Sequence, residues 1–247
     1  MNPSENNGDK LTPQTTFFMP ATLFALLIIA AQILVSLVTY PFLPATVPTH
    51  WNAAGQVNGY APRWVNAVLF PLISIGIFVL IRLLLAAGPR LGYQNSRRAN
   101  LDIVNLIING VLLLMLVLQL VVTAFSLGMN IDINFVVILS ISVLFIFIGN
   151  YLGKLRRNFW AGIRTPWTLA SDVVWERTHR FGGWLFVIGG LLGVTMSFIP
   201  FLRVWGFIVV VVAIVVILYV YSYIAYRRYT VESHEPLSPP FDNSDRG

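Results

Sequence analysis

The sequence predicts an all-α integral membrane protein with six transmembrane helices. Of its 247 residues 57% are hydrophobic and only 11% are charged, whereas a soluble domain usually carries about 25% charged residues. This composition excludes a soluble globular protein. Six apolar runs reach the roughly 20 residues that a helix needs to cross the hydrocarbon layer. The runs must be helical, because lipid offers no partner for unpaired backbone groups and the alternation of a membrane β-strand is absent.

The six runs follow one another along the chain, separated by charged or turn-forming residues. They cover residues 17–39, 64–86, 101–124, 133–152, 183–201 and 204–226. The first run is longer than the apolar core of a signal peptide and lacks a small-x-small cleavage pattern, so we interpret it as a permanent span. Residues 1–16 and 230–247 are polar and rich in Pro or Ser, and we expect both to be disordered cytoplasmic tails.

Basic residues are distributed unevenly between the two sides of the predicted bundle. Fourteen of the sixteen Lys and Arg residues fall on the side that holds both termini, and Arg63 and Arg203 fall on the other. The positive-inside rule therefore places both termini in the cytoplasm, residues 41–63 outside and residues 153–182 inside. Because the charges cluster between apolar runs, they indicate topology and give no basic stripe for direct binding of nucleic acid.

The runs divide into two predicted domains, each with one distinctive loop. We expect residues 17–86 to form an N-terminal domain of two helices, joined by an outer loop that contains His50, Trp51 and Asn52. We expect residues 87–229 to form a domain of four helices whose cytoplasmic loop spans residues 153–182. The two loops carry most of the candidate functional residues.

The outer loop is predicted to be a compact cap. Prolines at positions 41, 44 and 48 fix φ and favour extended geometry for the residues before them. Ala54-Gly55 and Asn58-Gly59 then predict two tight turns, because glycine adopts positive φ at low cost. The cap would present His50, Trp51 and Asn52 to an extracellular ligand. Alternatively, its rings belong to the interfacial aromatic belt and its polar side chains satisfy the loop backbone. One His with one Asn is a poor metal site.

The cytoplasmic loop is predicted to contain a short helix over residues 172–181. Ser171 is the expected N-cap, and Asp172 favours the positive end of the helix dipole. Gly182 offers a left-handed stop. We expect this helix to run along the membrane surface.

The predicted short helix has one distinctive face. Trp175 and His179 lie four residues apart on it, together with Asp172 and Thr178, and Glu176 and Arg180 are spaced to form an ion pair. Arginines alternate in this loop with Trp160, Trp167 and Trp175. Such a composition is typical of a segment at the lipid headgroups.

The loop also contains a recognisable pattern. The stretch from Asn158 to Arg180 includes the run GIRTPWTL at residues 162–169, then Ser171, Trp175 and Thr178-His179-Arg180. With Asn150 at the end of the preceding span, this pattern resembles the signature of the SdpI immunity-protein family. The outer pattern P-x-H-W-N-x-x-G-x-x-N-G-Y, at residues 48–60, resembles the uncharacterised N-terminal membrane domain that often precedes it.

The resemblance implies a six-span protein of a bacterial inner or plasma membrane. The founding member of the family protects its producer from a secreted toxic peptide and, when engaged by toxin, holds a transcriptional repressor at the membrane. The implied partners are membrane lipids, a peptide toxin outside and a repressor at the cytoplasmic face. The implied binding residues are His50, Trp51, Asn52, Gly55, Gly59, Asn150, Asn158, Gly162, Arg164, Thr165, Pro166, Trp167, Trp175, Thr178, His179 and Arg180.

Polar and small residues also occur inside the predicted spans. Asp102, Asn105 and Asn109 recur at helical spacing and could form a functional site in the bundle interior. Alternatively, Asp102 forms an interfacial ion pair near the cytoplasmic end of its span. Gly189, Gly193 and Ser197 form a ridge of small residues. Such a ridge lets a neighbouring helix approach closely, either within the bundle or between protomers.

Catalysis is not expected. The two loop histidines, His50 and His179, fall on opposite sides of a ~30 Å apolar layer and cannot share a site. The chain has no cysteine and no zinc-protease, nucleophile-elbow or phosphate-loop motif, so we expect neither a metal nor a cofactor. Three interpretations stay open: an immunity protein or signal receptor, a small-molecule or peptide transporter, and a structural subunit of a membrane assembly.

Overall fold

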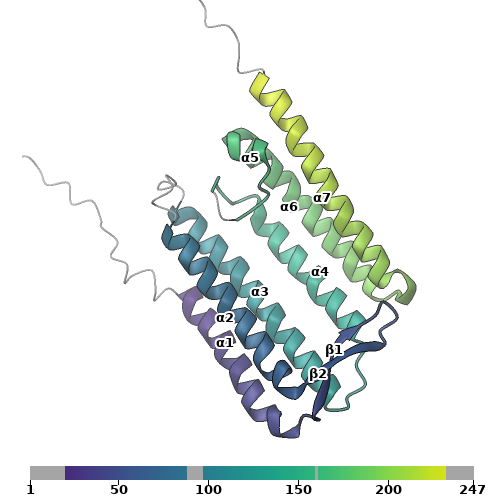
Figure 1. Cartoon of the computed structure of the whole chain (residues 1–247). Coiled ribbons are helices and arrows are strands. Elements are labelled where there is room, and N and C mark those ends of the chain that lie inside the picture. Colours follow the sequence, from purple (N-terminus) through teal and green to yellow (C-terminus); the bar gives the residue numbers. More distant parts are fainter. Residues whose placement is uncertain (1–19, 88–96, 159–160, 232–247) are drawn as a thin grey trace, which may run out of the picture. The chain divides into compact units, whose positions relative to one another are not determined.

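The computed structural model describes residues 20–87, 97–158 and 161–231. Its elements are α1 (Pro20–Thr39), the 3-10 turn η1 (Tyr40–Phe42), β1 (Thr46–Trp51), β2 (Val57–Pro62), α2 (Arg63–Ala87), α3 (Arg97–Ser126), α4 (Ile133–Leu152), α5 (Pro166–Ala170), α6 (Asp172–Ser197) and α7 (Pro200–Val231) (Figure 1). Within these residues six helices are long and apolar enough to cross a membrane. The predicted fold class is therefore confirmed. The side of the membrane that the termini face stays a prediction.

The predicted disordered tails fall almost wholly outside the described residues. Residues 1–16 and 232–247 are not among them, whereas Thr230 and Val231 belong to α7. The C-terminal helix is thus longer than the apolar run that predicts it.

The predicted short helix and the fifth span form one continuous helix, α6. Ser171 caps it as expected, since its hydroxyl oxygen accepts a hydrogen bond from the Val174 N–H at 3.4 Å. The stop predicted at Gly182 is wrong, and so is a separate helix along the membrane surface. Glycine is needed here for packing, because a Cβ on the adjacent Gly183 would lie 2.7 Å from the carbonyl oxygen of Gly149 in α4.

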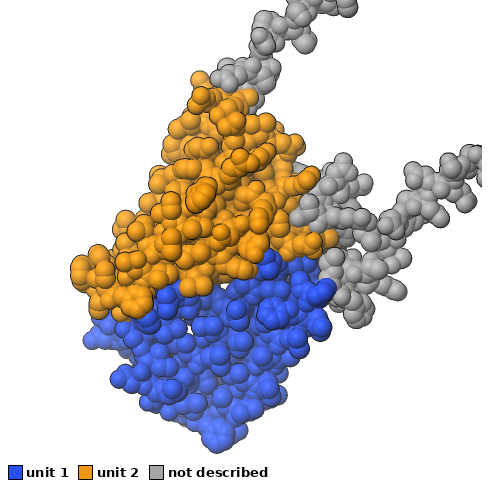
Figure 2. Space-filling view, turned by 180° about the vertical axis from the view of Figure 1, so that it is seen from behind, with its two compact units in different colours: residues 1–83, 104–140 blue, residues 84–103, 141–247 orange. Residues whose placement is uncertain are grey.

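The chain forms two compact units (Figure 2). Unit 1 comprises residues 1–83 and 104–140, and unit 2 comprises residues 84–103 and 141–247. The hairpin, α1 and most of α2 belong to unit 1, whereas α5, α6 and α7 belong to unit 2. Helices α3 and α4 each contribute to both.

In unit 1 the outer loop is a two-stranded antiparallel hairpin of β1 and β2. The turn predicted at Gly55 is confirmed, because this residue has a φ of +78°. The second turn, predicted at Gly59, is wrong. Gly59 lies within β2 opposite His50, next to a register shift. A Cβ at position 59 would lie 2.9 Å from the His50 Cβ, so glycine permits the close pairing of the strands at this point.

In unit 2 glycines bring α6 close to its neighbours. A Cβ on Gly190 would lie 2.6 Å from the backbone oxygen of Ser142 in α4, and one on Gly193 would lie 2.8 Å from the ring of Phe207 in α7. Ser197 is fully buried. The predicted small-residue ridge therefore packs within unit 2.

Candidate functional site

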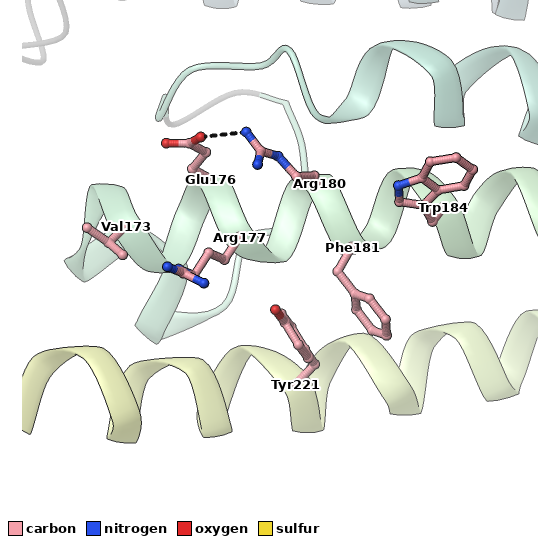
Figure 3. A pocket seen from close by; sticks show the side chains of 7 residues that line it. All are labelled: Val173, Glu176, Arg177, Arg180, Phe181, Trp184 and Tyr221. Carbon is pink, nitrogen blue, oxygen red and sulfur yellow. Dashed lines mark hydrogen bonds and ion pairs between the residues drawn. The ribbon is translucent and has the colours of Figure 1, made fainter.

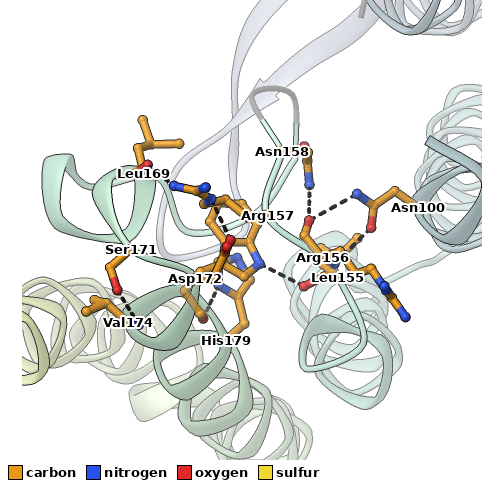
Figure 4. Close-up of polar contacts among 11 residues, drawn as sticks. Asn100, Leu155, Arg156, Arg157, Asn158, Leu169, Ser171, Asp172, Val174 and His179 are labelled. Carbon is orange, nitrogen blue, oxygen red and sulfur yellow. Dashed lines mark hydrogen bonds and ion pairs between the residues drawn. The ribbon is translucent and has the colours of Figure 1, made fainter. Parts of the chain in front are cut away.

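The loop after α4, helix α5 and the first turns of α6 form one hydrogen-bonded assembly in unit 2 (Figure 4). We call residues 155–180 the inner motif. Trp175 is 2% exposed. Its indole Nε1–H donates to the Leu155 carbonyl at 2.7 Å. Its ring stacks on His179, with ring centroids 4.0 Å apart and planes 19° apart. Trp175 thus ties the start of the loop to α6.

His179 is fully buried, and both of its ring nitrogens have partners. Nε2 lies 2.9 Å from the backbone nitrogen of Ile163, which can only donate, so Nε2 accepts. Nδ1 lies 2.9 Å from the carbonyl oxygen of Trp175, which can only accept, so Nδ1 carries the proton. These two contacts assign a neutral ring in a single tautomer.

The glycine of the GIRTPWTL run is required by this contact. Gly162 has a φ of +117°, a conformation that side chains rarely adopt. A Cβ at Gly162 would overlap the His179 ring. Only glycine therefore lets the Ile163 N–H reach Nε2.

The Thr-Pro-Trp-Thr segment forms the short helix α5. Thr165 and Thr168 make a reciprocal cap: the Thr168 N–H donates to the Thr165 hydroxyl at 3.2 Å, and the Thr165 N–H donates to the Thr168 hydroxyl at 2.9 Å. Pro166 occupies the first turn, where its missing N–H costs nothing. Trp167 then packs on Tyr219 and Tyr223 of α7, with ring centroids 5.1 Å apart in each case.

Arg157 connects the loop to both helices that follow it, α5 and α6. Its Nε lies 2.6 Å from a carboxylate oxygen of Asp172 at the start of α6. Its Nη1–H donates to the Leu169 carbonyl in α5 at 2.9 Å. One guanidinium group therefore holds the end of α5 against the N-terminus of α6 (Figure 4).

Asn100 of α3 fixes the other side of the loop. Its amide donates to the Arg156 carbonyl at 3.0 Å and accepts from the Arg156 N–H at 2.9 Å. Asn158 donates to the same carbonyl at 2.8 Å and accepts from the Ala161 N–H at 2.8 Å. Sequence reasoning missed Asn100 and Arg157. No local signal identifies Asn100, because its partner lies 56 residues further along the chain.

The predicted inner residues thus divide into a buried framework and an exposed surface. Thr165, Thr168, Trp175, Thr178 and His179 are buried. Arg164 and Arg180 are exposed, and Arg180 forms the predicted ion pair with Glu176 at 3.0 Å. Asn150 is also exposed, and its amide donates to the Ile146 carbonyl of its own helix at 2.7 Å. Trp160 lies outside the described residues.

The predicted outer residues lie together on the hairpin in unit 1. The Asn52 side-chain oxygen accepts from the Ala54 and Gln56 N–H groups, each at 3.0 Å, and so shapes the turn. Trp51 meets the Phe125 ring of α3 edge to face, with centroids 5.5 Å apart. His50 is exposed and contacts the Asn58 side chain through Nδ1. Of the three, His50 is therefore the most accessible.

The hairpin is also tied to the first turn of α4. The Asn134 amide donates to the carbonyls of Asn52 and Ala53, each at 3.1 Å. Sequence reasoning did not identify Asn134. The turn is thus held by contacts from its own side chain and from α4.

The interior of unit 1 contains a row of buried polar side chains, which we call the polar seam. Its members are Gln32, Ser36, Asn66, Ser74, Asn105, Asn109, Gln119 and Thr123. The Gln119 amide donates to the Gln32 carbonyl at 3.0 Å and to the Ser36 hydroxyl at 2.9 Å. The Asn66 amide donates to Thr123 at 3.1 Å. The seam therefore joins α1, α2 and α3.

The polar seam includes two of the three residues of the predicted stripe. Asn105 and Asn109 are buried, whereas Asp102 is exposed. The Asn109 amide donates to the Ala21 carbonyl at 3.0 Å. Within the described residues both amide atoms of Asn105, and the side-chain oxygen of Gln119, are buried without a hydrogen-bond partner. The part of the chain that the structure describes contains no group of three His, Asp or Glu side chains that could hold a metal ion.

Comparison with known proteins identifies relatives of both halves of the chain. Residues 154–224 match the SdpI/YfhL protein family, and residues 27–75 match a domain of unknown function, DUF1648. Immunity protein SdpI of Bacillus subtilis (strain 168) is 25% identical over 211 residues, which make up 85% of this chain and 97% of that protein. No solved structure matches. These matches confirm the predicted resemblance and, with the six helices, a multi-pass protein of the cell membrane.

Proposed function

We propose that this chain, as a relative of immunity protein SdpI, protects the cell that makes it from a secreted toxic peptide. The extent of the similarity carries the proposal, since the match covers 85% of this chain and nearly all of the relative. A shared single domain would leave one half of the relative unmatched. The relative is named as an immunity protein and not as an enzyme.

In this proposal the hairpin of unit 1 recognises the toxin. The turn is held by Asn52 and Asn134, so the exposed His50 is displayed on a fixed backbone. A preordered loop loses less conformational entropy on binding than a mobile one. This order supports a role in recognition.

The inner motif passes the toxin-bound state to a cytoplasmic partner, a transcriptional repressor. Its buried framework positions the exposed Arg164, whose guanidinium group suits carboxylates on a protein surface. Because His179 and Trp175 hold the loop on α6, a shift of α6 would carry Arg164 with it.

Complementation tests the proposal. A Bacillus subtilis strain without SdpI is grown beside its toxin-producing parent, with or without this chain. We expect the chain to restore survival. Arg164→Ala should abolish recruitment of a fluorescent repressor to the membrane, and His50→Ala should reduce survival.

Two matched controls separate these roles from folding. Arg227→Ala removes another exposed arginine, and Thr49→Ala truncates an exposed neighbour of His50. Both should behave as the parent chain does. The proposal is wrong if the parent chain reaches the membrane at normal abundance and gives no survival. It is also wrong if Arg164→Ala, Trp167→Ala and His179→Ala all leave survival and recruitment intact.

The polar seam supports a second candidate function, transport of a small polar solute. Polar groups inside a membrane bundle are costly, and those of Asn105 and Gln119 include atoms without a protein partner. Transport predicts that vesicles containing the protein take up glycerol or urea faster than empty ones, and that Asn105→Leu removes the difference. Equal uptake rates would exclude it for these solutes. The small-residue ridge gives no support to an assembly subunit, because it packs within unit 2.

A further inference from the structure

A pocket of about 420 Å³ lies on the surface of α6 and α7 in unit 2 (Figure 3). Its wall combines arginine, glutamate and aromatic side chains. Phe181 of α6 stacks on Tyr221 of α7, with ring centroids 4.3 Å apart and planes 26° apart. The stacked pair forms an apolar part of the wall next to the charged side chains.

The charged part of the pocket has an excess of positive charge. Arg180 pairs with Glu176 at 3.0 Å, but both side chains are largely exposed, at 73% and 65%. Arg177 lies over the Tyr229 ring, with its guanidinium carbon 4.0 Å from the centroid. Within the described residues Arg177 has no anionic partner. Two cations and one anion therefore leave one positive charge uncompensated.

The pocket lies where the exposed face of α6 changes character. Before Trp184 this face carries Glu176, Arg177 and Arg180. After Trp184, which is 67% exposed, the large exposed side chains are apolar and include Ile188 and Leu191. Tryptophan prefers the level at which lipid headgroups meet hydrocarbon. The change at Trp184 thus places the pocket at the membrane interface.

We propose that this pocket binds an anionic phospholipid. The phosphate pairs with Arg177 and Arg180, because a planar guanidinium group can give two parallel hydrogen bonds to phosphate oxygens. The start of the acyl chains covers Trp184 and the stacked Phe181 and Tyr221. A zwitterionic headgroup lacks the net negative charge that complements the pocket. A soluble phosphate lacks the acyl chains that would cover the aromatic side chains. This inference is independent of the proposed immunity function.

Lipid binding is measured by native mass spectrometry of the delipidated full chain, titrated with phosphatidylglycerol or phosphatidylcholine. We expect tighter binding of phosphatidylglycerol. Arg177→Gln and Arg180→Gln should each weaken it about fivefold, since each basic residue near an anionic surface contributes on that scale. Glu176→Gln should strengthen binding, because it removes the competing anion. A purely structural role of Glu176 does not predict this gain.

Arg227→Gln is the matched control, since it removes an exposed arginine of α7 that does not line the pocket. It should leave the preference for phosphatidylglycerol unchanged. Competition with glycerol 3-phosphate separates the lipid from a soluble phosphate. Displacement of the lipid at equal concentration would overturn the proposal, as would equal affinity for both lipids or an equal loss in the control. Thermal unfolding of each variant in detergent verifies that it is folded.

Discussion

The Ser36 hydroxyl of α1 lies 2.7 Å from the carbonyl oxygen of Ala67 in α2, to which it donates a hydrogen bond. In a regular helix the Ala67 carbonyl would accept a hydrogen bond from the N–H of residue 71. Residue 71 is a proline, which has no N–H, so this helical hydrogen bond is missing. The carbonyl of Gln32 is also within reach of the hydroxyl, but at 3.0 Å. Helix α1 therefore supplies the donor that α2 lacks.

This relationship predicts a coupled pair of substitutions. Ser36→Ala should lower the free energy of unfolding by about 1 kcal/mol, because it leaves the Ala67 carbonyl unpaired. In a Pro71→Ala background the helical hydrogen bond can form again, so the same substitution should cost less. Unfolding of the four proteins in detergent measures the coupling. If Ser36→Ala lowers the free energy of unfolding equally in both backgrounds, Ser36 does not replace the hydrogen bond that Pro71 cannot make.

Gly162→Ala should disrupt the inner motif. The substituted residue would need a positive φ and would overlap His179, and such strain costs about 1–3 kcal/mol. Limited proteolysis should show faster cleavage within residues 153–171. Gly76→Ala is the matched control, because no atom lies within 4 Å of the added Cβ. It should stabilise α2 slightly. Equal resistance of the Gly162 variant and the parent would contradict the assigned contact.

Gly190→Ala should destabilise unit 2. The new Cβ would lie 2.6 Å from the backbone oxygen of Ser142, and a backbone atom cannot move aside without moving α4. We expect a loss of about 1–3 kcal/mol in detergent unfolding. In Gly206→Ala the nearest atom is the sulfur of Met196 at 3.1 Å, on a flexible side chain. That control should be nearly neutral, and similar losses in both variants would argue against close packing at Gly190.

Asn134→Asp should loosen the hairpin without changing the shape of the side chain. The carboxylate cannot donate to the Asn52 and Ala53 carbonyls and places negative charge beside them. Hydrogen exchange of residues 52–58 should therefore become faster. Asn58→Asp provides a comparison within the hairpin, since Asn58 contacts His50 through its side-chain oxygen, which aspartate keeps. Unchanged exchange in the Asn134 variant would show that α4 does not hold the turn.

Arg157→Ala should cost more stability than Asp172→Asn. The Asp172 side chain is 75% exposed, and exposed ion pairs contribute only about 0.2–1 kcal/mol. Arg157 also holds the Leu169 carbonyl, and this bond survives in Asp172→Asn. Only the ion-pair contribution should fall as salt is raised. A larger cost for Asp172→Asn than for Arg157→Ala would overturn this ranking.

Features determined by local sequence could be predicted. The six spans follow from the length of the apolar runs, the start of α6 from the Ser171 cap, and the ion pair between Glu176 and Arg180 from its spacing. The turn at Gly55 likewise follows from the ease of positive φ in glycine. Each of these depends on one continuous segment of the chain.

Features determined by distant partners could not be predicted. Gly182 resembles a helix stop, but a Cβ there would lie 2.5 Å from the Ile163 side chain of the loop. Gly59 resembles a turn residue, although it pairs with His50 within the hairpin. The inner motif was recognised as a pattern, yet the residues that fasten it include Asn100, which is 56 positions from its partner. Such contacts leave no periodicity in the sequence.

The continuity of α6 has a mechanical consequence. Its 26 residues make a rod about 39 Å long, with Trp175 and His179 near one end and Ser197 at the other. Because α6 is one unbroken helix, a tilt of its part within the lipid would turn the end that contains His179 by the same angle. The loop is bonded to this end through Trp175 and His179, so it would move with the helix. Reorientation of the span would then change the direction of the exposed Arg164 side chain.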